Sequence, residues 1–499
     1  MEETIDVQTK CGVVKGYRKN GVYRFLGIPF AENPQRFKRS VELKKFSHPI
    51  DAKENQGSCY QFGGNFDGDT TPNQGEDCLC LNVFTKDNTK KKPVFVWIHG
   101  GGFMTGCSYY PMYDGTNFAN QDIVYVSINY RLGILGFWDF RKLGEEFESN
   151  IGISDQLTAL KWIKHNISSF GGDPDNVTIC GESAGGISVL YLLSSPSSKG
   201  LFNKAISESA LPYSIFDEKA EDIYTNAFLK NCGISSLNKE KLFEYTVEEL
   251  AKLMAKTNEE VSKDYPGYTI PAAVEDDLIP YDVLEGSKKK INKDVKLLIG
   301  TNRDEGTLFC NPSSHSLAPY EWKDIGKMLS ISGNSDIFEP LKDYFISAYK
   351  EKGSQEFTYN NLFLRGALDI LNERSKYQKD SYLFRFDYAT PITKKLNFNA
   401  CHALEMSFAL GTTDYMVGRH PFFIEYDEKE IKGVEEQMHQ AWVNFTKSGD
   451  PNCKELLIDW PKYEKDECLC HVFNIKPSTV SFKDYQPLKL FKDRRIYTK

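Results

Sequence analysis

The 499-residue sequence has no apolar run near the roughly 20 residues that a membrane-spanning helix requires, so no transmembrane anchor is expected. It also has no arginine-rich tract or basic stripe of the kind that binds nucleic acid. Its net charge of −8, from 61 basic and 69 acidic residues, is spread along the chain and is typical of a solvated surface. These absences argue against a nucleic-acid partner; they leave the oligomeric state undetermined.

The N-terminal sequence MEETIDVQTK is acidic and polar and lacks the apolar segment of a secretory signal. This favours a cytoplasmic protein, or a secreted one whose signal has been removed. The twelve cysteines fit buried thiols in the first case and disulfides in the second. Three N-x-S/T triplets, at Asn166, Asn176 and Asn444, would matter only on a secretory route.

Spacing motifs for metals and nucleotides are missing as well. The C-x-C pairs Cys78/Cys80 and Cys468/Cys470 differ from the C-x₂₋₄-C pairs of structural zinc sites. The glycine triplet at 100–102 is not followed by G-K-[ST], and the chain has no G-x-G-x-x-G spacing. The sequence therefore implies no metal and no organic cofactor, and it argues against a nucleotide-binding protein.

What the chain does contain is a series of short β-branched and apolar runs separated by helical or loop segments. Their apolar residues lie on both faces, which is typical of a largely parallel sheet covered by helices on both sides. With no internal repeat and no long linker, the sequence predicts a single α/β domain over residues 1–499, with helical lobes inserted at about 210–290 and 310–380. The runs lie within residues 92–98, 122–131, 176–180, 201–210, 295–302 and 381–388.

One run, NVTIC, continues into Gly181-Glu182-Ser183-Ala184-Gly185, a G-x-S-x-G sequence that precedes a helical pattern. A serine on such a strand-to-helix turn is strained and exposed, and small flanking residues let neighbouring backbone pass close by. The position predicts a nucleophilic Ser183, with Cys180 as a buried thiol and Glu182 as a buried structural carboxylate.

The strand-like VWI continues into His99-Gly100-Gly101-Gly102-Phe103. Glycines can turn backbone N–H groups toward the oxygen of a tetrahedral intermediate without obstruction by side chains. With an elbow serine downstream, Gly101, Gly102 and the N–H of Ala184 are the predicted oxyanion-hole donors.

A serine nucleophile needs a base, and in the order Ser…Asp/Glu…His the histidine comes last. His402 follows the strand-like SYLFRFDY and is the preferred base; His420 is the alternative. Three other histidines are expected to be structural or in an exposed loop: His315, His439 and His471.

For the acid, the sequence LLIGTNRDEG offers Asp304 and Glu305 side by side at a strand end. One of the two should face the histidine. Periodicity does not choose between them.

The ordered motifs resemble the type B carboxylesterase/cholinesterase family of α/β-hydrolases along nearly the whole chain. The resembling segments are FLGIPFAENP, EDCLCLNV, HGGGF, NYRLG, FGGDPDNVTICGESAGG, GLFNKAISESA, DEG after GTNR, the His402 segment and AWVNFTKSGDPN. The resemblance implies an α/β-hydrolase fold with a large, mostly parallel central sheet. It also implies Ser183 as nucleophile, Glu305 as the triad acid and His402 as base.

The same resemblance implies three structural links. These are a disulfide between Cys59 and Cys78 and the ion pairs Arg36–Glu76 and Arg131–Asp155.

The chain departs from the family pattern in several places. Cys80 stands where the family has an aromatic residue, VEDDLIP lacks the glycine of the family's turn, and the segment after ENP is shortened. Cys232 has no following cysteine before Cys310, so the family's second disulfide is not expected. The loop between Cys59 and Cys78 has no tryptophan, which argues against binding of a quaternary ammonium such as acetylcholine.

The sequence thus predicts a serine carboxylic-ester hydrolase of small to medium esters, working through a Ser-His-Glu triad and an acyl-enzyme. Within enzymes the alternative is a lipase or amidase activity of the same triad. A catalytically silent adhesion or binding member is the alternative outside enzymes; such members typically lose a triad residue, and all three are present.

Overall fold

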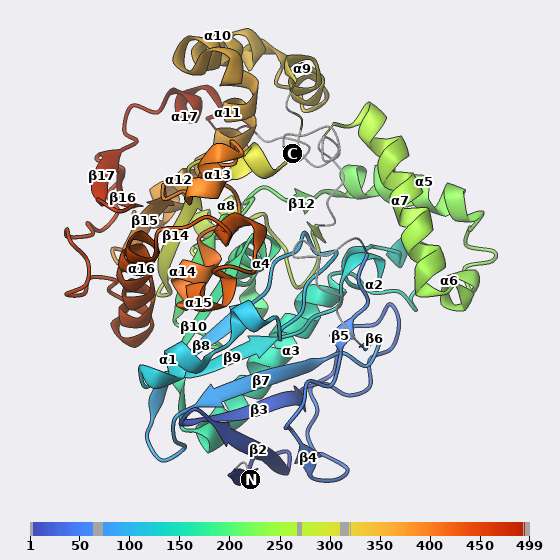
Figure 1. Ribbon diagram of the computed structural model, residues 1–499. Helices are drawn as coiled ribbons and strands as arrows, with labels where there is room; N and C mark the ends of the chain where they lie inside the picture. Colours follow the sequence, from blue (N-terminus) through green and yellow to red (C-terminus); the bar gives the residue numbers. More distant parts are fainter. Residues whose placement is uncertain are drawn as a thin grey trace.

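A mixed β-sheet forms the centre of the protein (Figure 1). The computed structural model describes residues 3–62, 73–266, 272–309, 319, 321–492 and 494, and within them the sheet has thirteen strands. In spatial order, with β4 (Ile50–Asp51) paired to β2, the strands are β1 (Thr4–Gln8), β2 (Val13–Lys19), β3 (Val22–Pro29), β7 (Cys80–Thr85), β9 (Val124–Ile128), β8 (Lys92–Ile98), β10 (Gly172–Glu182), β11 (Lys204–Glu208), β14 (Lys296–Asn302), β15 (Ser381–Phe386), β16 (Leu469–Phe473) and β17 (Ser478–Ser481).

From β9 to β16 in this order, each strand is parallel to the next one. The other pairs are antiparallel, except for β2 with β4, which is parallel. The runs predicted as strands are β8, β9, β10, β11, β14 and β15, so the predicted α/β class with a mostly parallel sheet is confirmed. Because parallel strands place their carboxyl ends at one edge, the polar sequences that follow β8, β10, β14 and β15 meet there.

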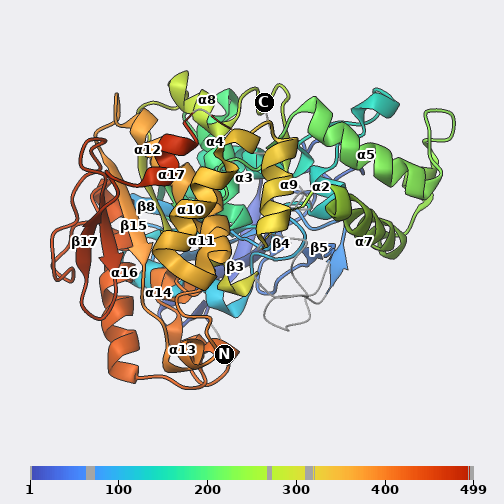
Figure 2. The ribbon, with the colours of Figure 1, turned by 90° about the horizontal axis from the view of Figure 1, so that it is seen from above.

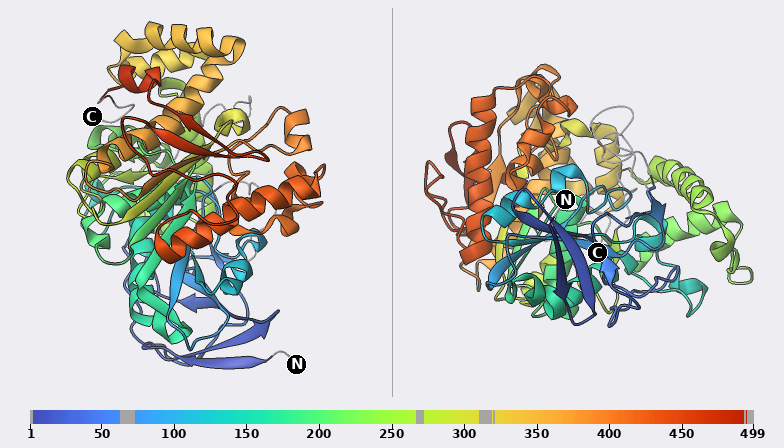
Figure 3. Two further views of the ribbon diagram at one scale, coloured as in Figure 1. Left: turned by 90° about the vertical axis from the view of Figure 1, so that its left-hand side faces the viewer. Right: turned by 60° about the horizontal axis from the view of Figure 1, so that its bottom comes forward.

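Side-chain alternation divides the sheet into two faces with different cores. In β8, Val94, Val96 and Ile98 pack in a core with helices α3 (Ile151–Asn166) and α4 (Ala184–Ser194). Phe95 and Trp97 point to the other face, whose core includes the apolar side of α16 (Glu428–Ser448). Figure 3 shows helices on both sides of the sheet.

The remaining helices cover these faces or form lobes beyond them. No helix of the described residues is long and apolar enough to span a bilayer. The remaining helices are α1 (Thr116–Asn120), α2 (Gly133–Phe137), α5 (Glu218–Cys232), α6 (Lys241–Glu244), α7 (Val247–Asp264), α8 (Val283–Lys288), α9 (Trp322–Ile331), α10 (Phe338–Tyr349), α11 (Gly353–Tyr359), α12 (Arg365–Arg374), α13 (Pro391–Lys395), α14 (Met406–Leu410), α15 (Thr413–Met416) and α17 (Gln486–Leu490).

The two predicted helical insertions are visible as separate lobes. Helices α5, α6 and α7 lie at the right of Figure 1, and α9 and α10 at the top; Figure 2 shows α5, α7, α9 and α10 from above. The second lobe has a small core of its own, which includes Ile325, Leu341, Phe345 and Phe357. A short strand pair, β12 (Ile215–Phe216) with β13 (Ala273–Val274), joins the two ends of the first lobe.

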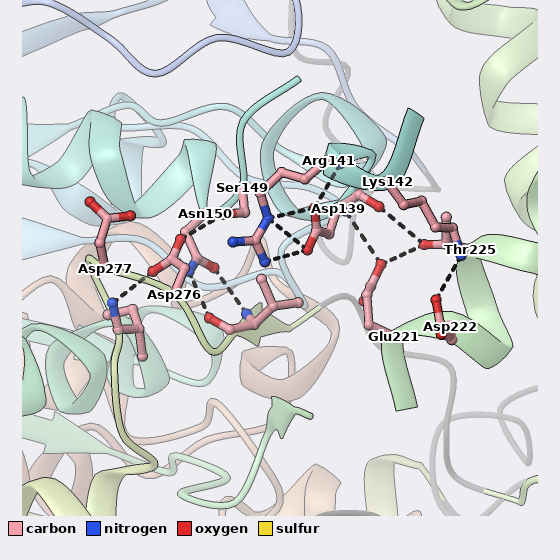
Figure 4. Close-up of polar contacts among 12 residues, drawn as sticks. Asp139, Arg141, Lys142, Ser149, Asn150, Glu221, Asp222, Thr225, Asp276 and Asp277 are labelled. Atoms are coloured by element: carbon pink, nitrogen blue, oxygen red, sulfur yellow. Dashed lines mark hydrogen bonds and ion pairs between the residues drawn. The ribbon is translucent and has the colours of Figure 1, made fainter. Parts of the chain in front are cut away.

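Polar contacts attach helix α5 to the body (Figure 4). Glu221 accepts hydrogen bonds from the Thr225 hydroxyl at 2.5 Å and from the Asp139 backbone N–H at 3.3 Å. Lys142 forms an ion pair with Asp222 at 2.7 Å. The first lobe is therefore fixed to the loop after α2 by buried as well as exposed polar groups.

The structural links implied by the family resemblance are present. Cys59 and Cys78 form a disulfide beside a short strand pair, β5 (Ser58–Cys59) with β6 (Gln74–Gly75). Arg36 Nε lies 2.6 Å from Glu76 Oε1. Cys232 forms no disulfide with any described cysteine, and Cys310 lies outside the described residues.

The second implied ion pair is almost fully buried. Arg131 donates from Nε and Nη2 to the two oxygens of Asp155, at 2.8 and 2.6 Å, and its backbone N–H adds a third bond. The pair fastens the loop after β9 to helix α3.

Replacing Asp155 with alanine is expected to lower the free energy of unfolding by about 3–5 kcal/mol, because it leaves the Arg131 guanidinium buried without its partner. The matched control is Glu3→Ala, which removes an exposed pair with Arg18 and should leave the free energy of unfolding nearly unchanged. Thermal and urea unfolding of the two variants measure the difference. Equal losses of stability would contradict the structural role of Asp155.

Candidate active site

Ser183 sits on the sharp turn between strand β10, which ends at Glu182, and helix α4, which begins at Ala184. Its backbone has φ 55° and ψ −123°, a conformation that costs a non-glycine residue about 1–3 kcal/mol. The flanking glycines allow the tight approach: a Cβ on Gly185 would overlap the Ile98 carbonyl oxygen, and one on Gly181 would lie 2.5 Å from the Gly185 carbonyl carbon. The strain and the crowding both fit a nucleophile turn.

The glycine loop after β8 lies beside this serine. Gly101 and Gly102 have φ of 105° and 61°, which turn the backbone in a way that other residues rarely adopt. Among the described residues, the N–H groups of Gly101, Gly102 and Ala184 donate no hydrogen bond. Three unpaired donors near one serine form a ready site for a developing oxyanion.

Substituting Gly101 with alanine is expected to lower kcat about 10²–10³-fold, the usual cost of losing one oxyanion donor. A Cβ there would overlap the Thr105 carbonyl oxygen and would be strained at φ 105°, so the loop must move. Steady-state hydrolysis of a p-nitrophenyl ester measures the effect. Gly433→Ala, in helix α16 with open space around it, is the control and should retain full activity; unchanged kcat in Gly101→Ala would contradict the assignment.

A carboxylate that follows the neighbouring strand β14 holds the imidazole of His402. Its Nδ1 lies 2.6 Å from Oε2 of Glu305, and both side chains are buried. The other oxygen of Glu305 accepts the backbone N–H of Asn302 at 2.7 Å. Phe309 and Phe363 contact the imidazole ring, with centroids at 5.1 and 5.4 Å.

Asp304, which the sequence left as an alternative acid, has other partners. Its carboxylate pairs with Arg303 at 2.9 Å and accepts the Ala400 backbone N–H at 3.2 Å. Asp304 thus fixes the loop that carries His402, and Glu305 is the acid that contacts the imidazole.

The second nitrogen of His402 has an acidic neighbour, Glu182, for which the sequence predicts only a structural role. Nε2 lies 3.1 Å from Oε1 of Glu182, and Glu182 is buried. No hydrogen bond joins Nε2 to Ser183 Oγ in the described structure, although both residues line one cavity. Catalytic hydrogen bonds commonly form only once substrate binds. The signal available in the sequence was the position of Glu182, adjacent to Ser183.

Further buried residues behind the site were missed by sequence reasoning. Glu405 accepts hydrogen bonds from the Ser209 hydroxyl at 2.9 Å and from the Asn302 side-chain amide. Glu208, beside Ser209, accepts from the Trp442 indole at 2.8 Å. Glu405 comes three residues after His402, and this spacing is the only sequence pattern that could have indicated a role for Glu405.

Four buried carboxylates lie at or behind this site, and several of its titratable groups have shifted pKa values. Burial lowers the pKa of His402, but the charges of Glu182 and Glu305 more than offset this and raise it to about 9. Burial raises the pKa of Glu182 well above its usual range, because its charged form is poorly solvated. Burial and neighbouring carboxylates also raise the pKa of Glu405 to about 7 and that of Glu208 to about 8.

The other candidate histidines within the described residues have different partners. His439 contacts the Ala409 carbonyl at 3.0 Å, and His471 stacks on Trp460 with centroids 5.0 Å apart. The Nδ1 of His420 accepts the Phe422 backbone N–H at 3.2 Å. His315 lies outside the described residues.

The cavity over Ser183 has a volume of about 320 Å³. Its walls are mainly apolar, and residues of the second lobe complete them. Its apolar side chains come from Met104, Tyr110, Met112, Tyr113, Leu211, Leu308, Phe309, Tyr359, Leu362, Phe363 and Met406. Within the described chain, no cluster of three His, Cys, Asp or Glu side chains could hold a metal ion.

Comparison with known proteins relates this arrangement to esterases. The sequence model of the Carboxylesterase family matches residues 3–486. The chain is 34% identical to the para-nitrobenzyl esterase of Bacillus subtilis (strain 168), covering 92% of this chain and 93% of that one. It is 30% identical to the phenmedipham hydrolase of Pseudarthrobacter oxydans, covering 92% and 93%. A solved PNB esterase structure superposes with a TM-score of 0.87 at 31% identity, covering 97% and 99%.

Proposed function

Because the chain belongs to the carboxylesterase family of α/β-hydrolases, and is thus a carboxylic-ester hydrolase, we propose that Ser183, His402 and Glu305 form its catalytic triad. The observation that carries this proposal is the 2.6 Å contact between Glu305 and His402 in a cavity that also holds the strained Ser183.

In the acylation step, Ser183 Oγ attacks the ester carbonyl carbon while His402 Nε2 takes its proton. The carbonyl oxygen becomes an oxyanion and accepts hydrogen bonds from the N–H groups of Gly101, Gly102 and Ala184. When the tetrahedral intermediate collapses, Nε2 gives its proton to the leaving alcohol and an acyl-serine remains. Water then repeats the sequence, releasing the acid and restoring Ser183.

Glu305 fixes the imidazole and stabilises its charged form, and Glu182 competes with the serine for Nε2. Before attack, Nε2 must leave Glu182 and turn to Ser183 Oγ. Substrate binding would exclude water from the cavity and favour this change.

The proximity of Glu182 predicts an alkaline pH profile. Only neutral His402 can accept the serine proton, so kcat/KM should rise with pH up to about 9, the pKa of His402. Glu182→Gln removes the carboxylate beside Nε2, which stabilises the imidazolium when it is ionised, so the acidic limb should move to lower pH. The profile of kcat/KM against pH measures this shift.

The control for this prediction is Glu339→Gln, an exposed position at the start of α10, which should leave the profile unchanged. An acidic limb that stays in place in Glu182→Gln would show that Glu182 does not act on His402.

The cavity lining supports uncharged esters with apolar acyl and alcohol parts as substrates. Its volume of about 320 Å³ is at the low end of ligand pockets, which favours small to medium esters. A relative is named for para-nitrobenzyl esters, and Tyr110, Tyr113 and Phe309 would contact an aromatic alcohol of that kind.

Hydrolysis rates for p-nitrophenyl esters of increasing acyl length test this substrate class. We expect kcat/KM to be highest for short and medium acyl chains and to fall for long ones. A maximum at the longest chains would favour a lipase-type substrate instead. Higher activity on an anilide than on the matching ester would favour an amidase.

A further inference from the structure

A second, larger cavity lies behind the catalytic acid. It has a volume of about 550 Å³ and is bordered by the ends of β14 and β15, by helices α10 and α11 and by the segment before α17. Tyr359 and Phe363 line both this cavity and the one over Ser183, so they form a shared wall. Nothing in the proposed ester hydrolysis uses the residues on its far side.

The charges around this cavity do not balance. Its two arginines already have partners: Arg303 pairs with Asp304 at 2.9 Å, and Arg385 pairs with Asp387 at 2.6 Å. Of the other carboxylates on its wall, Glu305 contacts His402 at 2.6 Å, and Glu356 and Asp484 form no ion pair with any described residue. The cavity therefore carries excess negative charge.

Glu356 is the more enclosed of these two carboxylates. In the described structure its side chain accepts only one hydrogen bond, from the Asn360 amide at 3.3 Å. Burial and the charge of Asp304 raise its pKa to about 7, while the charges of Lys352 and Arg303 act in the opposite direction. Neither cation forms an ion pair with it, so in mildly alkaline solution the carboxylate is ionised without a direct cationic contact.

Two further polar groups of the cavity wall are buried without partners. Tyr485 is only 8% exposed, and its hydroxyl forms no hydrogen bond with the described residues. The side-chain oxygen of Asn302, which is 3% exposed, also accepts none. Buried polar groups without partners are uncommon and costly, so they indicate that a bound group can supply the missing bonds.

The same wall is rich in aromatic rings, including those of Tyr344, Tyr349 and Tyr485. A ring face attracts a cation by about 0.5–2 kcal/mol, depending on how far the cation is desolvated. Phe482 also lines the cavity, but Arg385 already lies over its ring, 5.8 Å from the centroid.

We propose that this cavity is a binding site for a small organic ammonium ion with an apolar body. The ammonium group would donate to the Glu356 carboxylate and to the oxygens of Tyr485 and Asn302, and the apolar body would pack against the tyrosine rings. An anion is disfavoured because the arginines are already paired, and no described cluster of ligands fits a metal ion. The site is separate from the ester cavity and does not depend on the proposed hydrolysis.

Calorimetric titration of the whole protein with benzylammonium, at about pH 8, tests the proposal. We expect saturable binding of benzylammonium and at least about tenfold weaker binding of benzyl alcohol, its uncharged analogue. Glu356→Gln should raise the Kd about tenfold or more, since it removes the charge but keeps the shape. Tyr485→Phe should raise it severalfold, because it removes only the hydroxyl.

Glu351→Gln is the matched control, because Glu351 is an exposed glutamate just before α11, and its Kd should equal that of the parent. Thermal unfolding verifies that each variant is folded. The proposal is overturned if benzylammonium does not bind, if benzyl alcohol binds equally well, or if neither Glu356→Gln nor Tyr485→Phe changes the Kd.

Discussion

Replacing Ser183 with alanine is expected to lower kcat for ester hydrolysis about 10⁶-fold, the size of effect seen when a serine hydrolase loses its nucleophile. The substitution removes one oxygen from a half-buried side chain and keeps the backbone of the turn. Folding and substrate binding should therefore persist, with KM changing much less than kcat. Steady-state kinetics on a p-nitrophenyl ester, with thermal unfolding as a check, measures both.

The matched control is Ser197→Ala, at an exposed turn just after α4, which should have the parent's kcat. Retention of more than a small fraction of activity in Ser183→Ala would mean that another group attacks the ester.

Replacing Glu305 with glutamine is expected to lower kcat about 10⁴-fold, although the two side chains have nearly the same shape. The amide removes the negative charge that stabilises the imidazolium, and it can hold His402 in the wrong tautomer. Glu305 Oε2 lies 2.6 Å from Nδ1, and no other carboxylate of the described residues forms an ion pair with that nitrogen.

Asp304→Asn is the adjacent control, because it changes the neighbouring acid whose partners are Arg303 and Ala400. We expect it to reduce kcat far less than Glu305→Gln. The reverse order, with Asp304→Asn the more damaging, would assign the triad acid to Asp304.

Much of this architecture could be predicted from the sequence because its signals are local. The apolar runs of β8, β10 and β14 are buried on both faces, and each is followed directly by a chemically distinctive segment. A parallel sheet brings such segments to one edge, so Ser183 and the glycine loop could be placed together without coordinates.

What could not be predicted depends on side-chain direction. Asp304 and Glu305 are adjacent, and only the geometry of the turn decides that Glu305 meets His402. Glu182 precedes Ser183 in sequence, yet its contact with Nε2 follows from the way in which β10 ends. The cavity around Glu356 is formed by packing of the second lobe against the sheet, which no local pattern encodes.

The nucleophile assignment is tested most directly by titrating the protein with an organophosphate and locating the adduct by peptide mass spectrometry. The account predicts one phosphoryl group per chain, attached to Ser183, with esterase activity lost in proportion to labelling. A fully inhibited protein with no adduct on Ser183, or a fully labelled protein that remains active, would contradict it.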